Sequence, residues 1–268
     1  MARRIRDGVR LLLLLSSWAV LAGFVGSRIG RVHERNLALD TLQSYRNRPA
    51  SEQLLVSVQE VVGIVKYHSA FEQDKWVAQS IFPKVGDGFF VDVGSADGVK
   101  ESNTKTLEDR GWRGVCVDPF PTNMETRTCT VFTDVVSSEP GRTVRFQKAG
   151  FLSGMVDHLG STKNWVRDPE IVELTTTTLA EILRRANAPR LIHYMSLDIE
   201  GAELEALRGF PFAEHDLGSL TVEHNWEEPK RTLIRRLLED HGYRYALTLE
   251  RDDCYLPRKT LPRPQAPP

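Results

Sequence analysis

Acidic residues follow several short apolar runs of this sequence, at positions where they could bind a ligand or accept a proton. The first run lies in GFFVDVGSADGVKESNT, residues 88–104, where Asp92 precedes a glycine loop. The next run, GVCVD, ends in Asp118. Carboxylates can hold ribose hydroxyls, take up protons or ligate hard cations. A second group follows two later apolar runs and comprises Asp198, Glu200, Glu223, His224 and Asn225.

The glycine loop fits S-adenosylmethionine better than a nucleotide phosphate. A Walker loop needs Lys and then Ser or Thr after its last glycine, whereas Val99 follows Gly98 here. A dinucleotide loop reads GxGxxG, and this loop has Asp97 where a pyrophosphate would lie. S-adenosylmethionine carries a cation and no phosphate, and small residues let the backbone approach it closely. The candidate cofactor residues are Asp92, Gly94, Ser95, Ala96, Gly98, Asn103, Asp118 and Asp198.

The alternative is that this loop has only a structural role, as an ordinary turn beside an unrelated surface acid. Asn103 stands at the start of the next expected helix, where it could cap that helix as well as contact a ligand. The spacing from the loop to Asp118 favours a ligand site, because an acid at the tip of the second strand binds ribose hydroxyls in Rossmann-like proteins.

The second group could activate a hydroxyl for methyl transfer. Transfer to oxygen requires removal of the hydroxyl proton, and the ordinary pKa of histidine suits His224 for that role. Asp198, Glu200 and Glu223 are the other catalytic candidates. Alternatively, Asp198, Glu223 and Asn225 could hold a divalent cation through oxygen ligands. If their role is only structural, these acids cap helices or pair with arginine.

Strands that alternate with helices are expected to position these residues. Such an order predicts an α/β fold with a mainly parallel sheet and helices on both faces. Ligands then bind outside the carboxyl ends of the strands. The stretch 148–170 is predicted to be a substrate lid beside a hairpin-like insertion. Strands are expected at 89–93, 114–118, 130–136, 192–199 and 219–225.

Several linked motifs resemble the FkbM family of S-adenosylmethionine-dependent methyltransferases. The segment GFFVDVGSADGVKESNTKTLEDRGWRGVCVDPFPTN carries the resemblance, and TTTTLAEIL, YMSLDIEGAELEALRGF and TVEHN follow in the family's order. The likeness implies a class I, Rossmann-like methyltransferase and, for most relatives, O-methylation of sugar or polyketide-type hydroxyls. It also implies that Glu72 and Asp74 could fold over the cofactor. It carries over the cofactor roles of Asp92, Gly94, Ala96, Gly98 and Asp118.

Two functions from different classes follow. The first is an enzyme that methylates a small-molecule or glycan acceptor, namely a saccharide or another hydroxyl-bearing compound. The second is a non-catalytic, membrane-anchored protein that uses the same fold for binding or trafficking. The retained acids at Asp92, Asp118 and Asp198 favour the enzyme.

Composition narrows the partners. A net charge of -1 over 268 residues leaves no excess of Lys and Arg for a phosphate backbone, so nucleic acid is not an expected partner. The three cysteines form no CxxC pair, which argues against a zinc site and against a disulfide scaffold. A single disulfide remains open, and with it the redox compartment. The oligomeric state is not indicated.

The N-terminus predicts a membrane anchor. Four arginines within the first ten residues precede the charge-free run Leu11–Ser27, which is about as long as the shortest membrane-spanning helices, ~17 residues. A signal anchor with its N-terminus inside is the expectation, and a cleaved secretory signal is the alternative. The expected organisation is an anchor at 1–27, a stalk and amphipathic helix at 28–66, the FkbM-like domain at 67–257 and a disordered Pro-rich tail at 258–268.

Overall fold

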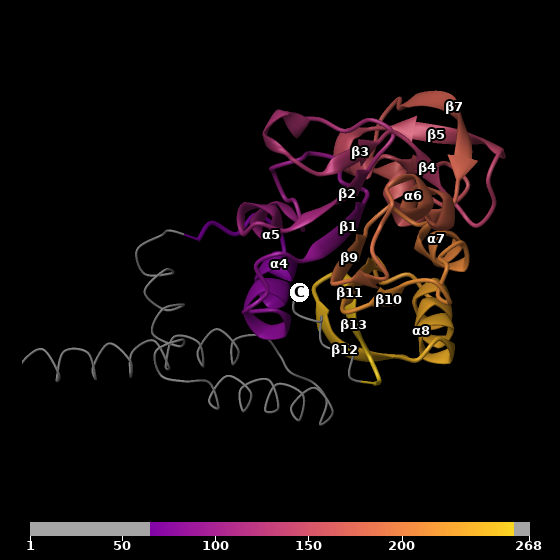
Figure 1. The fold of residues 1–268 in the computed structure, drawn as a ribbon. Coiled ribbons are helices and arrows are strands. Elements are labelled where there is room, and N and C mark those ends of the chain that lie inside the picture. Colours follow the sequence, from indigo (N-terminus) through magenta and orange to yellow (C-terminus); the bar gives the residue numbers. More distant parts are fainter. Residues whose placement is uncertain (1–64, 260–268) are drawn as a thin grey trace, which may run out of the picture. The chain divides into compact units, whose positions relative to one another are not determined.

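The computed structural model describes residues 65–259 (Figure 1), and the described residues from Lys66 onward belong to one compact unit. The expected anchor and almost all of the expected stalk and tail lie outside the described residues. Within the described part, no helix has the length and hydropathy that crossing a membrane requires.

A seven-stranded sheet forms the centre of this unit, in the order β12-β13-β11-β9-β1-β2-β3. Parallel pairing joins β3, β2, β1, β9 and β11, whereas β13 runs antiparallel to β11 and β12. The expectation of a mainly parallel sheet is therefore confirmed. The strands are β1 (Phe89–Val93), β2 (Arg113–Val117), β3 (Thr130–Phe132), β9 (Tyr194–Leu197), β11 (Leu220–Glu223), β12 (Tyr243–Leu249) and β13 (Asp252–Pro257).

Helices cover both faces of the sheet (Figure 1). One face carries α6 (Leu179–Arg185), α7 (Glu203–Arg208) and α8 (Lys230–Asp240), and the other carries α4 (Gln73–Lys75), the adjoining η1 (Trp76–Ile81) and α5 (Lys105–Asp109). The main core lies on the α6–α8 side, because alternate strand residues point there. Full burial of each Val or Leu stabilises the fold by about 1.5–3 kcal/mol. The strand residues of this core include Val91, Val93, Val115, Val117, Met195, Leu197 and Val222.

The opposite face of the sheet buries several polar side chains. Asp92 accepts a hydrogen bond from the Thr104 hydroxyl at 2.5 Å, before α5 begins. The Gln73 amide of α4 donates to Asp252 of β13 at 2.9 Å. These bonds offset the cost of burying polar groups, which is large when a donor or acceptor lacks a partner. They also hold α4 and the start of α5 against the strands.

An insertion between β3 and α6 forms a second sheet in the order β4-β7-β5-β6. β5 and β7 pair antiparallel, as the hairpin-like insertion predicted. The strand expected at 130–136 is instead split into β3 and β4, because β4 leaves the main sheet and pairs with β7. The strand expected at 192–199 is split in the same way, since β8 pairs with β10. The elements are β4 (Val135–Val136), β5 (Thr143–Lys148), β6 (Gly154–Met155), β7 (Glu170–Thr177), β8 (Leu191–Ile192), β10 (Asp216–Leu217), η2 (Met124–Thr126), η3 (Gly150–Leu152) and η4 (Ser161–Asn164).

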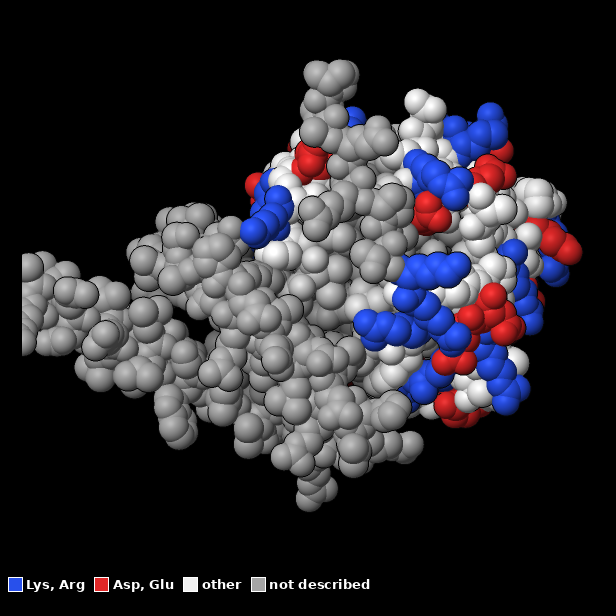
Figure 2. Space-filling view, turned by 60° about the horizontal axis from the view of Figure 1, so that its bottom comes forward, with Lys and Arg blue, Asp and Glu red and all other residues white. Residues whose placement is uncertain are grey.

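Charges of both signs are mixed on the described surface. Figure 2 shows Lys and Arg side chains gathered on one face with Asp and Glu side chains among them. Arg184 and Glu181 form one exposed pair at 2.7 Å, and Arg190 and Asp216 form another at 2.9 Å. Pairs of this kind contribute only ~0–1 kcal/mol each. The mixture agrees with a net charge near zero.

Candidate functional site

The sheet register brings the candidate acids to one edge. The last apolar residues of β1, β2, β9 and β11 are level with one another across the sheet. The residue that follows in each strand therefore stands at the carboxyl edge, where parallel sheets bind ligands. These four residues are Gly94, Asp118, Asp198 and Glu223.

Gly94 and Ala96 shape the loop after β1. Gly94 has φ +89°, and a Cβ on it would lie 1.7 Å from the carbonyl oxygen of Asp198. Ala96 has φ 34°, and its backbone N–H donates to Asp118 Oδ2 at 3.0 Å. The loop thus touches the ends of both neighbouring strands, and only a residue without a side chain fits at position 94.

Asp118 is held in place by backbone donors. Ala96 N–H reaches one carboxylate oxygen, and Phe120 N–H reaches the other at 2.7 Å. Burial raises the pKa of Asp118 above its ordinary value, and the two backbone bonds oppose that rise. The carboxylate is therefore fixed in direction while it still borders an open space.

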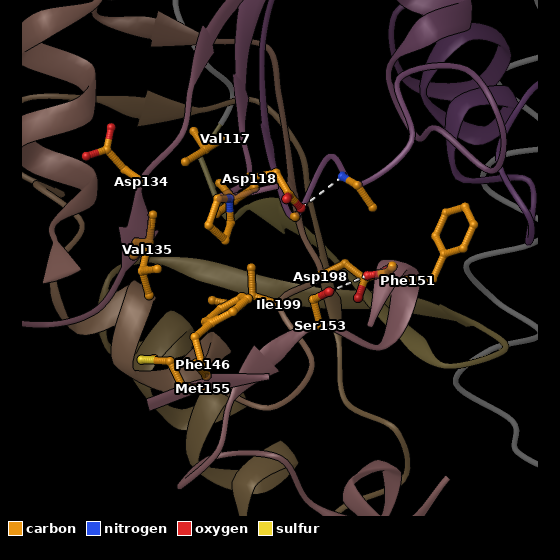
Figure 3. A pocket seen from close by; sticks show the side chains of 17 residues that line it. Val117, Asp118, Asp134, Val135, Phe146, Phe151, Ser153, Met155, Asp198 and Ile199 are labelled. Atoms are coloured by element: carbon orange, nitrogen blue, oxygen red, sulfur yellow. Dashed lines mark hydrogen bonds between the residues drawn. The ribbon is translucent and has the colours of Figure 1, made fainter. Parts of the chain in front are cut away.

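That space is a pocket at the carboxyl edge, with about 480 Å³ between its walls, part of it open to solvent. Gly94, Ala96, Asp118 and Asp198 line it. Figure 3 shows Val135, Phe146 and Met155 on one side, and Asp198 toward the other with Ser153 and Phe151. A surface with one apolar wall and a few fixed polar groups is typical of small-molecule sites. The apolar wall includes Val135, Phe146, Met155 and Ile199.

A cluster of three carboxylates adjoins the pocket. Asp198, Glu200 and Glu223 each place one oxygen within 4.8 Å of the others. Glu200 also accepts a hydrogen bond from Asn225 Nδ2 at 3.4 Å and another from the Thr162 hydroxyl. Asp198 belongs to both the pocket and the cluster, so the two features are continuous.

Burial and the charges of neighbouring acids raise the pKa values of all three acids. Burial is the larger cause, and it raises the pKa of Asp198 to about 6 and that of Glu200 to about 8. The pKa of Glu223 rises well above its ordinary value for the same reasons, with the charge of Asp198 as the next cause. Acids that retain a proton near neutral pH can also take one up there, which suits acid–base chemistry.

The family comparison agrees with this geometry. A family model described as "Methyltransferase FkbM domain" matches residues 92–245, which contain the glycine loop, Asp118 and the three-acid cluster. The chain belongs to the FkbM methyltransferase family. No curated protein matched the chain.

Part of the predicted cofactor set lies in the wall of the FkbM pocket, and part lies behind it. Gly94, Ala96, Asp118 and Asp198 line the pocket. Asp92 lies beneath the loop and is bonded to Thr104 instead. Alternation along β1 explains this, because Asp92 points toward the face that α5 covers. The other predicted cofactor residues outside the pocket lining are Ser95, Gly98 and Asn103.

These three residues have structural contacts of their own. A Cβ on Gly98 would lie 2.7 Å from the Asn123 carbonyl oxygen, so that glycine permits a close backbone approach. The Asn103 amide donates to Ser196 Oγ at 2.9 Å and joins the start of α5 to β9. Ser95 is buried, and its hydroxyl has no partner among the described residues.

His224 is not brought together with the three acids. It is buried, and its Nδ1 accepts a hydrogen bond from Trp226 N–H at 2.9 Å. Its Nε2 lies 3.5 Å from Asp253 Oδ1, on the side of the sheet that α8 covers. Burial lowers the pKa of His224 to about 4, which leaves the ring neutral and a weak proton acceptor. Its contacts are those of a group that supports the turn after β11.

Residues 148–170 contribute to the wall of the FkbM pocket, as a substrate lid must. Gly150, Phe151, Ser153 and Met155 all line it. A Cβ on Gly201 would lie 2.0 Å from the carbonyl oxygen of His158, so this segment packs directly on the turn after Glu200. The lid role itself stays a prediction, because lining the pocket does not imply that the segment opens and closes.

The acidic segment before β1 holds the structure together at a different place. Asp74 is fully buried and accepts hydrogen bonds from the His68 N–H at 2.7 Å and from Thr106. Glu72 is exposed and pairs with Lys75 at 3.2 Å. Neither lines the pocket. The contacts of Asp74 tie the segment before α4 to α5.

Sequence reasoning missed the apolar wall. Val135 and Val136 follow β3 and could have been found from their place near the end of the third strand. Phe146 comes from the insertion, and nothing in its local sequence pattern points to the pocket. Its position depends on how β5 folds back over the carboxyl edge.

Proposed function

We propose that this FkbM methyltransferase transfers a methyl group from S-adenosylmethionine to a hydroxyl oxygen of a saccharide or another hydroxyl-bearing acceptor. The observation that carries the proposal is the shared edge of Asp118, Asp198 and Glu223, which unites a ribose-binding acid with proton-accepting acids. The family comparison supports methyl transfer, and the acceptor is inferred from the site.

The residues of the pocket fit S-adenosylmethionine, which supplies the methyl group. Asp118 is positioned for ribose hydroxyls at the end of β2. The apolar side chains of Val135 and Phe146 suit an adenine ring. Gly94 and Ala96 leave room beside the loop, and none of these residues resembles a phosphate site.

The arrangement of the sheet supports a class I, Rossmann-like methyltransferase. The central parallel strands carry helices on both faces, and one antiparallel strand, β13, lies between β11 and β12. β1 lies at the centre, between β2 and β9, so that the glycine loop meets the tips of both neighbours. Ligand sites in such sheets form at this position.

The acidic cluster supports transfer to oxygen. In this reaction an oxygen–methyl bond forms, the sulfur–methyl bond breaks, the sulfonium becomes a neutral thioether, and the hydroxyl proton leaves. Asp198 lies at the boundary between pocket and cluster, where it could receive that proton or orient the hydroxyl. A divalent cation held by the cluster would serve the same end, since it lowers the pKa of a bound hydroxyl.

Two exposed tryptophans near the cluster favour a ring-shaped polyol as acceptor. Trp226 is 60% exposed and directly follows Asn225, which bonds to Glu200. Trp165 is 55% exposed and its N–H donates to the carbonyl of Thr162, which also bonds to Glu200. Indole faces can pack against the C–H face of a sugar ring while carboxylates accept from its hydroxyls.

Cofactor binding tests the proposal. Calorimetry of the purified full chain with S-adenosylmethionine or S-adenosylhomocysteine should show binding at one site per chain. Asp118→Ala should weaken it at least about tenfold, because it removes a charged hydrogen-bond partner worth ~1.5–3 kcal/mol. The matched control is Asp240→Ala, at the exposed end of α8, which should bind as the parent does. Failure of the parent chain to bind either compound would refute the methyltransferase function.

Turnover separates the enzyme from a non-catalytic binding protein. Incubation of the chain with methyl-labelled S-adenosylmethionine and extracted glycans or glycolipids should label a hydroxyl-bearing product. Chemical analysis of the product should find the label as a methyl ether. Binding of cofactor without any labelled product would favour the binding or trafficking role.

We further propose that an N-terminal signal anchor attaches the domain to a membrane. The support is the arginine-flanked apolar run Leu11–Ser27. A disulfide between Cys116 and Cys129 favours an oxidising compartment for the domain. With arginines clustered before the run, the N-terminus would stay inside and the domain would lie on the other side.

A further inference from the structure

We infer that Asp198, Glu200 and Glu223 bind one divalent cation beside the pocket. The inference deepens the proposed function and rests on it for the cation's role, which is to orient and acidify the acceptor hydroxyl. The binding itself can be measured without methyl transfer. The ligand set differs from that expected from sequence, in which Asn225 was a ligand and Glu200 was not.

The spacing of the three acids suits a single ion. Each offers an oxygen within 4.8 Å of the other two. Two oxygens bound to one cation lie at most twice the metal–oxygen distance apart, which is about 5 Å for Ca²⁺ at ~2.5 Å and about 4 Å for Mg²⁺ at ~2.1 Å. All three carboxylates can therefore reach one central ion with only small side-chain adjustments. Oxygen-only ligands select hard cations such as Mg²⁺, Mn²⁺ or Ca²⁺.

Within the described part of the chain, no direct ion pair neutralises the cluster, and the charge of Arg251 only partly opposes the effect of burial on Asp198 and Glu200. Among residues 65–259, no Lys, Arg or His forms an ion pair within 4.0 Å with Asp198, Glu200 or Glu223. Lys230, which is half-buried, pairs with Glu203 and Glu227 instead. Several buried carboxylates without a cation are costly, because each charge loses its hydration.

An unsatisfied oxygen points to the missing ligand. Glu223 is only 6% exposed, and no N–H or O–H donor reaches its Oε2. The Glu223 carboxyl also contacts the Asp198 carboxyl. Two carboxyl groups in contact share either a proton or a cation. Asp252, which is level with Glu223 across the sheet, also has an oxygen without a partner. Buried acceptors of this kind are normally satisfied.

The residues around Glu200 orient it as a ligand. Asn225 Nδ2 donates to Glu200 Oε2 at 3.4 Å, and the Thr162 hydroxyl donates to the same carboxylate. Groups that bond to metal ligands in this way fix their direction and strengthen binding. Asn225 and Trp226 have φ 45° and 60°, so the backbone is held in a strained turn that directs the amide toward Glu200.

Manganese binding tests the inference directly. The full chain, purified in detergent and stripped of metal with a chelator, is titrated with MnCl₂, and free Mn²⁺ is measured by electron paramagnetic resonance. One Mn²⁺ per chain is expected. Glu200→Gln and Glu223→Gln should each weaken binding at least about tenfold. Glu173→Gln, which removes the same charge from an exposed site on β7, should bind as the parent does.

Thermal unfolding provides a second readout that a general loss of folding would not reproduce. Without metal, Glu223→Gln should unfold at the same or a higher temperature than the parent, because it removes repulsion among buried carboxylates. Added Mn²⁺ should raise the unfolding temperature of the parent but not that of the variant. Two outcomes would overturn the inference. One is that the parent binds no stoichiometric Mn²⁺ at millimolar metal, and the other is that both glutamine variants bind Mn²⁺ as tightly as the parent.

The same preparation shows whether the metal site or the proposed methyltransferase function is wrong. Calorimetry with S-adenosylhomocysteine reports on the pocket that contains Asp118, without need of metal or acceptor. Cofactor binding without Mn²⁺ binding would refute the metal site alone. Mn²⁺ binding without cofactor binding would refute the methyltransferase proposal alone.

Discussion

Gly94 shows how one residue can serve both the loop and the site. Its positive φ already favours glycine, but the neighbouring strand imposes a stricter demand, because a Cβ would overlap the carbonyl of Asp198. The close approach of the loop to β9 places Asp118 and Asp198 on the two sides of one pocket. Glycine at this position therefore reflects packing of the protein on itself as much as room for a cofactor.

Substitution of Gly94 should separate these effects. Gly94→Ala is expected to lower the free energy of unfolding by more than about 3 kcal/mol, because backbone strain and a clash with Asp198 add together. Gly141→Ala is the matched control: it also has positive φ, at +77°, but open space around it, and should cost only about 1 kcal/mol. Urea unfolding of both variants measures the difference, and equal losses would show that the contact with β9 has no consequence.

At the scale of elements, charged contacts join α8 to β13, which lies between β12 and β11 in the central sheet. Arg231 and Arg235 of α8 donate to Asp253 of β13, with Arg231 Nη2 at 2.6 Å and Arg235 Nη2 at 2.9 Å. His224 lies against the same carboxylate. Burial alone would raise the pKa of Asp253, but the bonds from Arg231 and Thr248 outweigh it and lower the pKa. This network fixes β13 and α8 behind the tip of β11.

The lowered pKa predicts how stability depends on pH. An acid with a folded pKa below its unfolded value stabilises the fold above the unfolded value, and that contribution is lost as pH falls through the folded pKa. Asp253→Asn should therefore cost about 2 kcal/mol near neutral pH and progressively less below about pH 4. Urea unfolding at several pH values tests this. The control Asp240→Asn, at the exposed end of α8, should cost little at any pH. A constant cost for Asp253→Asn would contradict the ionic role.

At the scale of the whole molecule, the disulfide bears on where the chain resides. Cys116 in β2 and Cys129, which directly precedes β3, are bonded, and Cys254 in β13 is buried and free. Disulfides persist in oxidising compartments and are rare in the cytosol. This disulfide and the apolar run before Arg28 support the proposal that the domain and the N-terminus lie on opposite sides of a membrane.

Thiol counting tests that topology on the full chain. Cells that express it are quenched with acid, and the denatured protein is treated with a maleimide carrying a polyethylene glycol tag. One cysteine should react before reduction and three after it, and the protein should stay with membranes after alkaline carbonate extraction. In a Cys116→Ser variant, two thiols should react without reduction. Reaction of all three cysteines in the unreduced parent would contradict the oxidising compartment.

The local sequence was sufficient for the main parallel strands and for the loop chemistry. Short apolar runs that alternate with helical patterns predicted the strands, because buried parallel strands require apolar residues on both faces. The loop from Gly94 to Gly98 and the acid at Asp118 indicated the methyl donor, and the family comparison bears out that class of activity. These features depend on neighbours in the chain, so the sequence alone determined them.

Only the tertiary structure decided which side chains meet. Asp92 lies within β1 and Asp118 directly follows β2, so strand alternation turns Asp92 toward α5, while Asp118 borders the pocket. Alternation also separates Glu223 from His224, whose ring faces the side of α8. Glu200 joins the acidic cluster because the turn after β9 is packed against residues of the insertion. Such contacts depend on register and on segments far apart in the chain, which no local pattern records.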